Sequence, residues 1–133
     1  MAERETILVV EDEKPLLTAV RRLLERASYT VLSAASVAEA IEVAANYPEP
    51  IDLLLSDYLL PSATGRQLAQ VLRRSRPNLR VLFMSGYSGE DLPPETEDDV
   101  EAEYVQKPFA ADQLLLHVNG VLHPRRRRSD AAG

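Results

Sequence analysis

One short stretch decides the fold: Ile51-Asp52-Leu53-Leu54-Leu55-Ser56-Asp57-Tyr58-Leu59-Leu60-Pro61. It is an apolar run that ends on a carboxylate and continues into a loop with a proline. An apolar run of this length without alternation is typical of a strand buried on both faces, as in a parallel sheet. Asp57 is then expected at the carboxyl end of the strand, the edge at which open α/β sheets bind ligands. We therefore expect the rest of the chain to supply the scaffold and the partners of Asp57.

Strand and helix patterns alternate along the rest of the chain. Four more short apolar runs predict strands at residues 6–10, 29–32, 79–84 and 102–105. Apolar residues at helical spacing predict helices at residues 15–26, 36–47, 65–75 and 110–122. A further helix is expected by alternation at residues 88–99, but Pro93-Pro94 and a dense acidic run predict that it is short or irregular. This order predicts an α/β fold of βαβ units around a parallel sheet.

Two of the predicted helices begin with capping boxes, in which Ser or Thr is followed three residues later by Glu or Gln. Ser36 with Glu39 opens one helix, and Thr64 with Gln67 opens the next. In the second of these helices the residues predicted to face the core are Leu68, Val71 and Leu72.

Length and composition indicate a single domain. The chain has 133 residues, no cysteine and a net charge of −6. The absence of cysteine excludes structural disulfides and thiolate metal sites. An acidic body argues against a nucleic-acid surface, and no apolar run is long enough to cross a membrane, so we expect a cytoplasmic protein. We expect residues 1–123 to form the domain and residues 124–133, with their four arginines, to form a disordered tail.

Polar residues follow four of the predicted strands. Glu11 and Asp12 follow the first strand, Asp57 the third, Ser85 the fourth and Lys107 the fifth. Because the carboxyl ends of parallel strands converge on one edge of the sheet, these side chains can share a site.

This set of residues is suited to phosphoryl chemistry. Three close carboxylates stay ionised together only when a cation lies between them. Oxygen ligands without His or Cys favour Mg²⁺, with Mn²⁺ as an alternative, over zinc or copper. Lys107 supplies a charge for a phosphoryl oxygen and Ser85 a hydrogen-bond donor, while Gly86 leaves room for a bulky group. The residues predict a Mg²⁺-dependent site in which Asp57 is the nucleophile.

At this point the chain resembles a receiver domain of two-component response regulators, over about residues 5–122. The matching motifs are Val9-Val10-Glu11-Asp12, Asp57-Tyr58-Leu59-Leu60-Pro61 with Gly65 eight positions after Asp57, Phe83-Met84-Ser85-Gly86-Tyr87 and Tyr104-Val105-Gln106-Lys107-Pro108-Phe109. The resemblance implies a flavodoxin-like, doubly wound sheet of five parallel strands in the order 2-1-3-4-5, with helices on both faces.

The resemblance also implies a metal site and a phosphoacceptor. Asp57 would accept a phosphoryl group from a histidine kinase or a histidine phosphotransfer protein. Asp12 would bind Mg²⁺ directly and Glu11 through water, and Asp57 and the backbone carbonyl of Leu59 would complete the ligands from the protein.

Other residues are implied to act after the transfer. Ser85 and Lys107 would hold the phosphoryl oxygens, and the movement of Ser85 would be coupled to the rotamer of Tyr104. The Lys107–Pro108 peptide bond matches one that is usually cis in the family. The resemblance therefore implies that the protein is a signalling switch and a monomer or weak dimer. Such a domain promotes its own phosphorylation and dephosphorylation but is not an enzyme.

Several alternatives stay open on the sequence. Residues 76–87 resemble receivers attached to hybrid histidine kinases, so the chain is either a free-standing regulator or the receiver portion of such a kinase. One rival function is an aspartyl-phosphate hydrolase or transferase for small molecules, although such enzymes generally place an acid where Leu59 stands. A second rival is a receiver-like interaction module that never takes phosphate. The first acidic position is Glu11 where the family more commonly has Asp.

Overall fold

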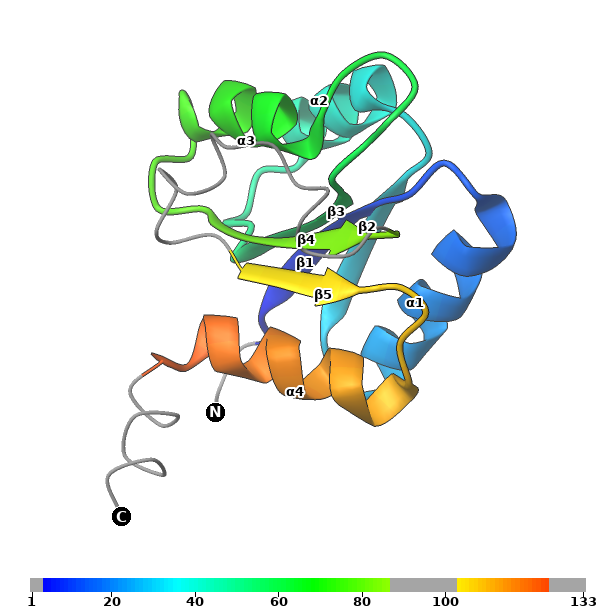
Figure 1. Ribbon diagram of the computed structural model, residues 1–133. Helices are drawn as coiled ribbons and strands as arrows, with labels where there is room; N and C mark the ends of the chain where they lie inside the picture. The colour runs from blue at the N-terminus through cyan, green and yellow to red at the C-terminus, as the bar shows by residue number, and fades with distance from the viewer. Residues whose placement is uncertain (1–3, 87–102, 125–133) are drawn as a thin grey trace.

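The computed structural model describes residues 4–86 and 103–124, which form a parallel sheet covered by helices on both faces (Figure 1). The strands are β1 (Thr6–Val10), β2 (Thr30–Ala34), β3 (Leu53–Asp57), β4 (Arg80–Ser85) and β5 (Glu103–Gln106). The helices are α1 (Lys14–Arg26), α2 (Val37–Asn46), α3 (Gly65–Arg73) and α4 (Ala111–Leu122). The strand order is β2-β1-β3-β4-β5 and every pairing is parallel. The predicted fold class and strand order are therefore confirmed.

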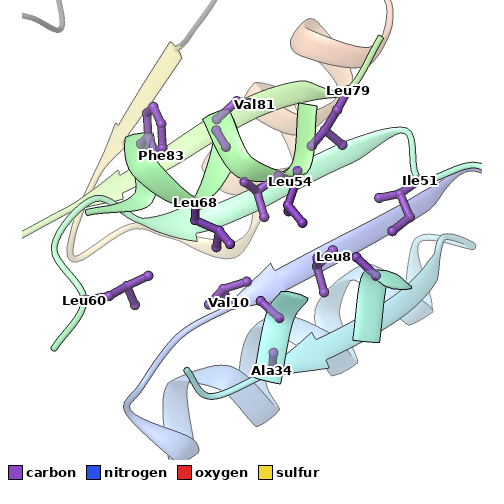
Figure 2. Packing of buried hydrophobic residues seen from close by; sticks show 14 of the residues in the cluster. Leu8, Val10, Ala34, Ile51, Leu54, Leu60, Leu68, Leu79, Val81 and Phe83 are labelled. Atoms are coloured by element: carbon purple, nitrogen blue, oxygen red, sulfur yellow. The ribbon is translucent and has the colours of Figure 1, made fainter. Parts of the chain in front are cut away.

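The central strands are apolar throughout because both of their faces are covered. Every residue of β1 and β3 is buried. Successive side chains of a strand point to opposite faces, so Leu8 and Leu54 enter one core and Ile7 and Leu53 enter the other. The first core lies under α2 and α3, as Figure 2 shows, and the second lies against α1 and α4. The sheet is therefore packed between two layers of helices.

The strand register aligns the carboxyl ends of four strands. Val10 pairs with Ser56 across β1 and β3, and Asp57 pairs with Met84 across β3 and β4. Ser85 pairs with Gln106 across β4 and β5. The residues immediately after these strands therefore emerge side by side on one edge of the sheet.

Capping boxes begin α2 and α3 much as the sequence predicts. Thr64 accepts a hydrogen bond from the amide of Gln67, and the Gln67 side chain accepts one from the amide of Thr64. Ser36 accepts from the amide of Glu39, whereas the Glu39 carboxylate reaches one residue further back, to the amide of Ala35.

The prediction that Val71 faces the core is wrong, because its side chain is 37% exposed. The buried residues of α3 are Gly65, Leu68, Ala69 and Leu72. At 100° per residue these four form one narrow stripe, and Val71 falls on its flank.

Two predictions fall on other parts of the chain. The short or irregular helix expected at residues 88–99 lies outside the described residues, as does nearly all of the tail expected at residues 124–133. None of the helices in the described ranges has the length and hydropathy that a bilayer crossing requires.

Candidate functional site

The backbone just past the strands continues the hydrogen-bond ladder of the sheet. The amide of Glu11 donates to the carbonyl of Ala34 at 3.1 Å, and the amide of Lys107 donates to the carbonyl of Ser85 at 2.7 Å. The amide of Tyr58, next to Asp57, donates to a carbonyl of β4. These bonds fix the positions from which the polar side chains extend.

Lys107 joins two carboxylates at this edge of the sheet. Its Nζ lies 2.5 Å from Oδ1 of Asp57 and 2.8 Å from Oε1 of Glu11. The second carboxylate oxygen of Glu11 accepts a hydrogen bond from the amide of Glu13 at 2.9 Å. Glu11 is fully buried and Asp57 is 5% exposed. Paired charges at this depth interact far more strongly than charges in water.

A cleft opens above these residues. Its volume is about 370 Å³, and its lining includes Asp12, Asp57, Leu59, Ser85 and Lys107. The cleft therefore brings together side chains from the ends of four strands, as the sequence predicts, with the loop that follows β3.

The acidic residues form a set of oxygen ligands. One carboxylate oxygen from each of Glu11, Asp12 and Asp57 lies within 4.8 Å of the others. Asp12 is exposed, whereas the other two are buried. Hard oxygen ligands at this spacing fit a small divalent cation such as Mg²⁺. This cluster is where the chain could hold such a cation.

Burial and mutual contacts shift the pKa values of Asp57, Glu11 and Lys107. Burial, followed by the hydrogen bond with the Glu11 carboxyl group, raises the pKa of Asp57 to about 7. Burial also opposes ionisation of Glu11, but hydrogen bonds with Asp57, Lys107 and the Glu13 amide outweigh it and lower the pKa of Glu11. Burial works against the Lys107 ammonium as well, yet its bonds to both acids raise the pKa of Lys107. The metal-free site therefore has an ionised Glu11, a charged Lys107 and an Asp57 that titrates near neutrality.

Three aromatic rings lie beside the carboxylate cleft. Tyr58 meets Phe83 edge to face with ring centroids 5.4 Å apart, and Phe83 lies 5.2 Å from Tyr104. The centroids of the two tyrosine rings are 6.1 Å apart. Tyr104 is half-buried and packs against the core under α2 and α3. Its ring contacts Tyr58, the residue after Asp57, but it does not line the cleft.

Sequence reasoning identified the members of the site but missed some of its contacts. Glu11, Asp12, Asp57, Ser85 and Lys107 come together as expected, and the Lys107–Pro108 peptide bond is cis. The link from Glu11 to Lys107 and the ring contacts of Tyr58 and Phe83 were not anticipated. The sequence could have indicated this ring cluster, because Tyr58, Phe83 and Tyr104 lie in or just after neighbouring strands. The roles that the resemblance implies for these residues stay predictions.

Comparison with known proteins identifies the family. The family model for the response regulator receiver domain matches residues 7–119. The chain is 32% identical over 117 residues to the sensor kinase CckA of Brucella abortus, covering 88% of this chain but 12% of that kinase. It is 29% identical to the response regulator receiver protein CpdR of the same organism, covering 87% of this chain and 95% of CpdR. The chain thus spans a small part of one relative and nearly all of the other.

Solved structures agree with this match. The receiver domain of the hybrid histidine kinase CckA superposes with a TM-score of 0.74 at 32% identity, covering 88% of this chain and 98% of that domain. A response regulator receiver protein from Sinorhizobium medicae superposes with a TM-score of 0.78 at 30% identity, covering 92% of this chain and 98% of that protein.

The strand order, the acidic edge of the sheet and these matches all lead to one family. The chain belongs to the response regulator receiver domains, the signalling domains of two-component systems that interact with histidine kinases or phosphotransfer proteins.

Proposed function

We propose that this chain is a phosphorylation-dependent switch that accepts a phosphoryl group on Asp57 and then changes its affinity for a partner protein. The observation that carries the proposal is the position of Lys107, whose ammonium contacts Asp57 at the mouth of a cleft where three carboxylates converge. A buried carboxylate with an adjacent fixed cation and a cluster of oxygen ligands is the arrangement that phosphoryl transfer to an Asp requires.

The proposed donor is a phosphohistidine on a histidine kinase or a phosphotransfer protein. A carboxylate oxygen of Asp57 forms the new bond to phosphorus, and the bond from phosphorus to the imidazole nitrogen breaks. The leaving imidazole takes up a proton from solvent. The ammonium of Lys107 and the hydroxyl of Ser85, which both line the cleft, would then hold phosphoryl oxygens. Because the kinase phosphate derives from ATP, the compartment that we propose is the cytoplasm.

The acidic residues would hold the cation that this reaction uses. Glu11, Asp12, Asp57 and the backbone carbonyl of Leu59 are the proposed ligands, with Glu11 acting through water. Mg²⁺ bound there would offset the negative charge of the transferring group, and Mn²⁺ fits the same oxygen ligands.

Acylphosphate formation is the direct test. The chain is incubated with Mg²⁺ and acetyl phosphate, and the intact mass is measured. We expect one added phosphoryl group in the wild type and none in Asp57→Asn. Asp52→Asn is the matched control, because Asp52 lies at the opposite edge of the sheet, where it accepts a hydrogen bond from the amide of Thr6. Modification that survives in Asp57→Asn, or a wild type that is never modified, would contradict the proposal.

A turnover assay on the same protein distinguishes the proposed switch from a phosphatase or transferase that acts on small molecules. Leu59, which is 51% exposed at the mouth of the cleft, offers no acid for repeated turnover. We therefore expect no steady-state release of phosphate from phosphate esters. Sustained turnover would favour the enzyme instead.

A further inference from the structure

A second cleft lies at the amino edge of the sheet, the edge opposite to the carboxylate cleft. Its volume is about 670 Å³, and its lining includes Glu5 before β1, Tyr47 and Glu49 after α2, and Asp52 before β3. The three acids outnumber Arg4, which is the one basic residue among the described residues of the lining. This amino-edge cleft is therefore acidic, and the proposed phosphoryl chemistry makes no use of it.

Two of the acids have carboxylate oxygens that are available for a further partner. Asp52 uses Oδ2 to accept a hydrogen bond from the amide of Thr6 at 2.8 Å. Within residues 4–86 and 103–124, no hydrogen bond or ion pair reaches Oδ1 of Asp52 or the carboxylate of Glu49. Glu49 is exposed and Asp52 is half-buried. Both can therefore receive a cation from outside the described part of the domain.

Tyr47 adds an aromatic ring to the lining of the amino-edge cleft. Its hydroxyl shares a hydrogen bond of 3.2 Å with Oγ1 of Thr6, and Thr6 is buried, so the ring is anchored at its polar end. A guanidinium group stacks on aromatic faces and also pairs with carboxylates through two parallel hydrogen bonds. A ring beside open carboxylates therefore suits the side chain of an arginine.

The chain leaves its last described helix at the rim of this cleft. Figure 1 shows that α4 ends at the amino edge of the sheet. His123, the residue after α4, has its Nε2 atom 3.1 Å from Oε1 of Glu5, which lines the cleft. The guanidinium of Arg80 also holds this end of the helix, because it donates to the carbonyl of Val121 at 2.6 Å. The direction from which the following residues start is therefore fixed.

Four consecutive arginines follow this exit after a single proline. They occupy residues 125–128, which lie outside the described residues. Four extended residues span roughly 13 Å, and the run starts two positions after the residue that contacts Glu5. The arginines are therefore within reach of the acids and of the ring of Tyr47.

We propose that the arginine run at residues 125–128 folds back and docks in the amino-edge cleft, with guanidinium groups on Glu49, Asp52 and the ring of Tyr47. Single ion pairs at a surface are weak. The run is tethered at His123, however, so its effective concentration at the cleft is high and several weak contacts act together. Docking replaces the disordered tail that the sequence predicts. It leaves the carboxylate cleft open and does not depend on phosphorylation of Asp57.

A spin label on the tail tests the docking directly. The chain has no cysteine, so Ser129→Cys carries a single label. We expect strong loss of the amide NMR signals of Thr6, Glu49 and Asp52, and little loss at Asp12 and Ser85 on the opposite edge. The loss should fade near 1 M salt, where the Debye length is about 3 Å. No loss, or an even loss over both edges, would show a tail that does not dock and would overturn the proposal.

Substitutions identify the groups that hold the tail. Replacing all four arginines at residues 125–128 by Gln should abolish the loss of signal, and replacing them by Lys should leave part of it, because the charge remains without the planar guanidinium. Glu49→Gln should weaken the loss. Glu42→Gln is the matched control, because Glu42 is exposed on α2 and lies outside the cleft. Signal loss that survives the four Gln substitutions, or that is the same for Glu42→Gln and Glu49→Gln, would overturn the proposal.

A mixing experiment distinguishes the chain's own tail from the tail of a second copy. Isotope-labelled chain without the spin label is mixed with spin-labelled chain that carries no isotope. We expect no loss of signal at the amino-edge cleft in this mixture, because each tail docks on its own domain. Loss of signal at Thr6, Glu49 and Asp52 in the mixture would mean that the tail of another molecule fills the cleft, and it would overturn docking within one chain.

Discussion

The backbone carbonyl oxygen of Asp57 lies against Gly65, so close that a Cβ on Gly65 would collide with it. The same Cβ would meet the ring of Phe83 at 2.9 Å. The amide of Gly65 donates to the carbonyl of Tyr58 at 2.6 Å, which ties the start of α3 to the end of β3. The glycine that stands eight positions after the phosphoacceptor candidate is therefore required by close packing under the site.

We predict that Gly65→Ala destabilises the chain. The colliding atoms belong to backbone and to a fully buried ring, so no flexible side chain can move aside, and we expect a loss of about 1–3 kcal/mol in the free energy of unfolding. Gly86→Ala is the matched control, because a Cβ there meets no atom of residues 4–86 or 103–124 within 4 Å. We expect that variant to stay within about 0.5 kcal/mol of wild type. Urea unfolding measures both, and equal stabilities for the two variants would contradict the packing argument.

Arg76, which follows α3, binds the carboxyl end of α2. Its guanidinium donates to the backbone carbonyls of Ala44, Tyr47 and Glu49 at 2.8–3.0 Å. These carbonyls lie in and just beyond the last turn of the helix, where the regular helical hydrogen bonds end. The Ala44 carbonyl also accepts a bond of 3.4 Å from the amide of Tyr47. We predict that Arg76→Ala lowers the free energy of unfolding by about 2 kcal/mol, because several bonds to a charged donor are lost together.

Arg74 supplies the control for that measurement. It is exposed and lies two residues earlier, so Arg74→Ala should change the free energy of unfolding by no more than about 0.5 kcal/mol. Arg76→Lys should fall between wild type and Arg76→Ala, since an ammonium cannot reproduce the fork of the guanidinium. Equal losses for Arg74→Ala and Arg76→Ala would show that the carbonyl contacts contribute nothing.

The raised pKa of Asp57 predicts how stability depends on pH in the metal-free chain. The folded chain keeps a proton on Asp57 up to about pH 7, whereas the unfolded chain releases it near pH 3.8. The free energy of unfolding therefore falls as pH rises through this window, with a slope of at most about 1.4 kcal/mol per pH unit. The lowered pKa of Glu11 acts in the opposite direction, at pH values below its ordinary 4.5.

Unfolding in urea with EDTA, repeated from pH 5 to pH 8, measures this dependence. Asp57→Asn cannot lose the proton, so its stability should change less with pH over that range and should exceed that of the wild type at pH 8. Parallel profiles for the two proteins would show that Asp57 does not titrate in the window.

The same proton predicts that Mg²⁺ binding depends on pH. The cation needs the ionised form of Asp57, so each pH unit below 7 should weaken the apparent affinity by up to about tenfold. Calorimetry in two buffers with different ionisation enthalpies should detect proton release at pH 6 that vanishes at pH 8. Asp57→Asn should release no proton at either pH, and Mg²⁺ binding by the wild type without proton release at pH 6 would contradict the prediction.

Local signals in the sequence carried much of the fold. Buried parallel strands appear in the sequence as continuous apolar runs. The capping box at Thr64 and Gln67 marked the start of α3 because both of its hydrogen bonds are made within four residues. Val71 was misjudged because its exposure depends on how α3 is rotated over the sheet, which the pattern of a single helix leaves open.

The sequence by itself determined which residues could form the site, because polar residues at the ends of apolar strands must gather on one edge of a parallel sheet. Only the tertiary structure decided which of those residues contact one another. Lys107 contacts Glu11, 96 positions away in the sequence, because the fold brings the ends of β1 and β5 to the same edge of the sheet. Gly65 is required because the Asp57 carbonyl and the Phe83 ring converge on it. Contacts of this kind depend on the distance between elements and on the direction of each side chain, and residue order alone contains neither.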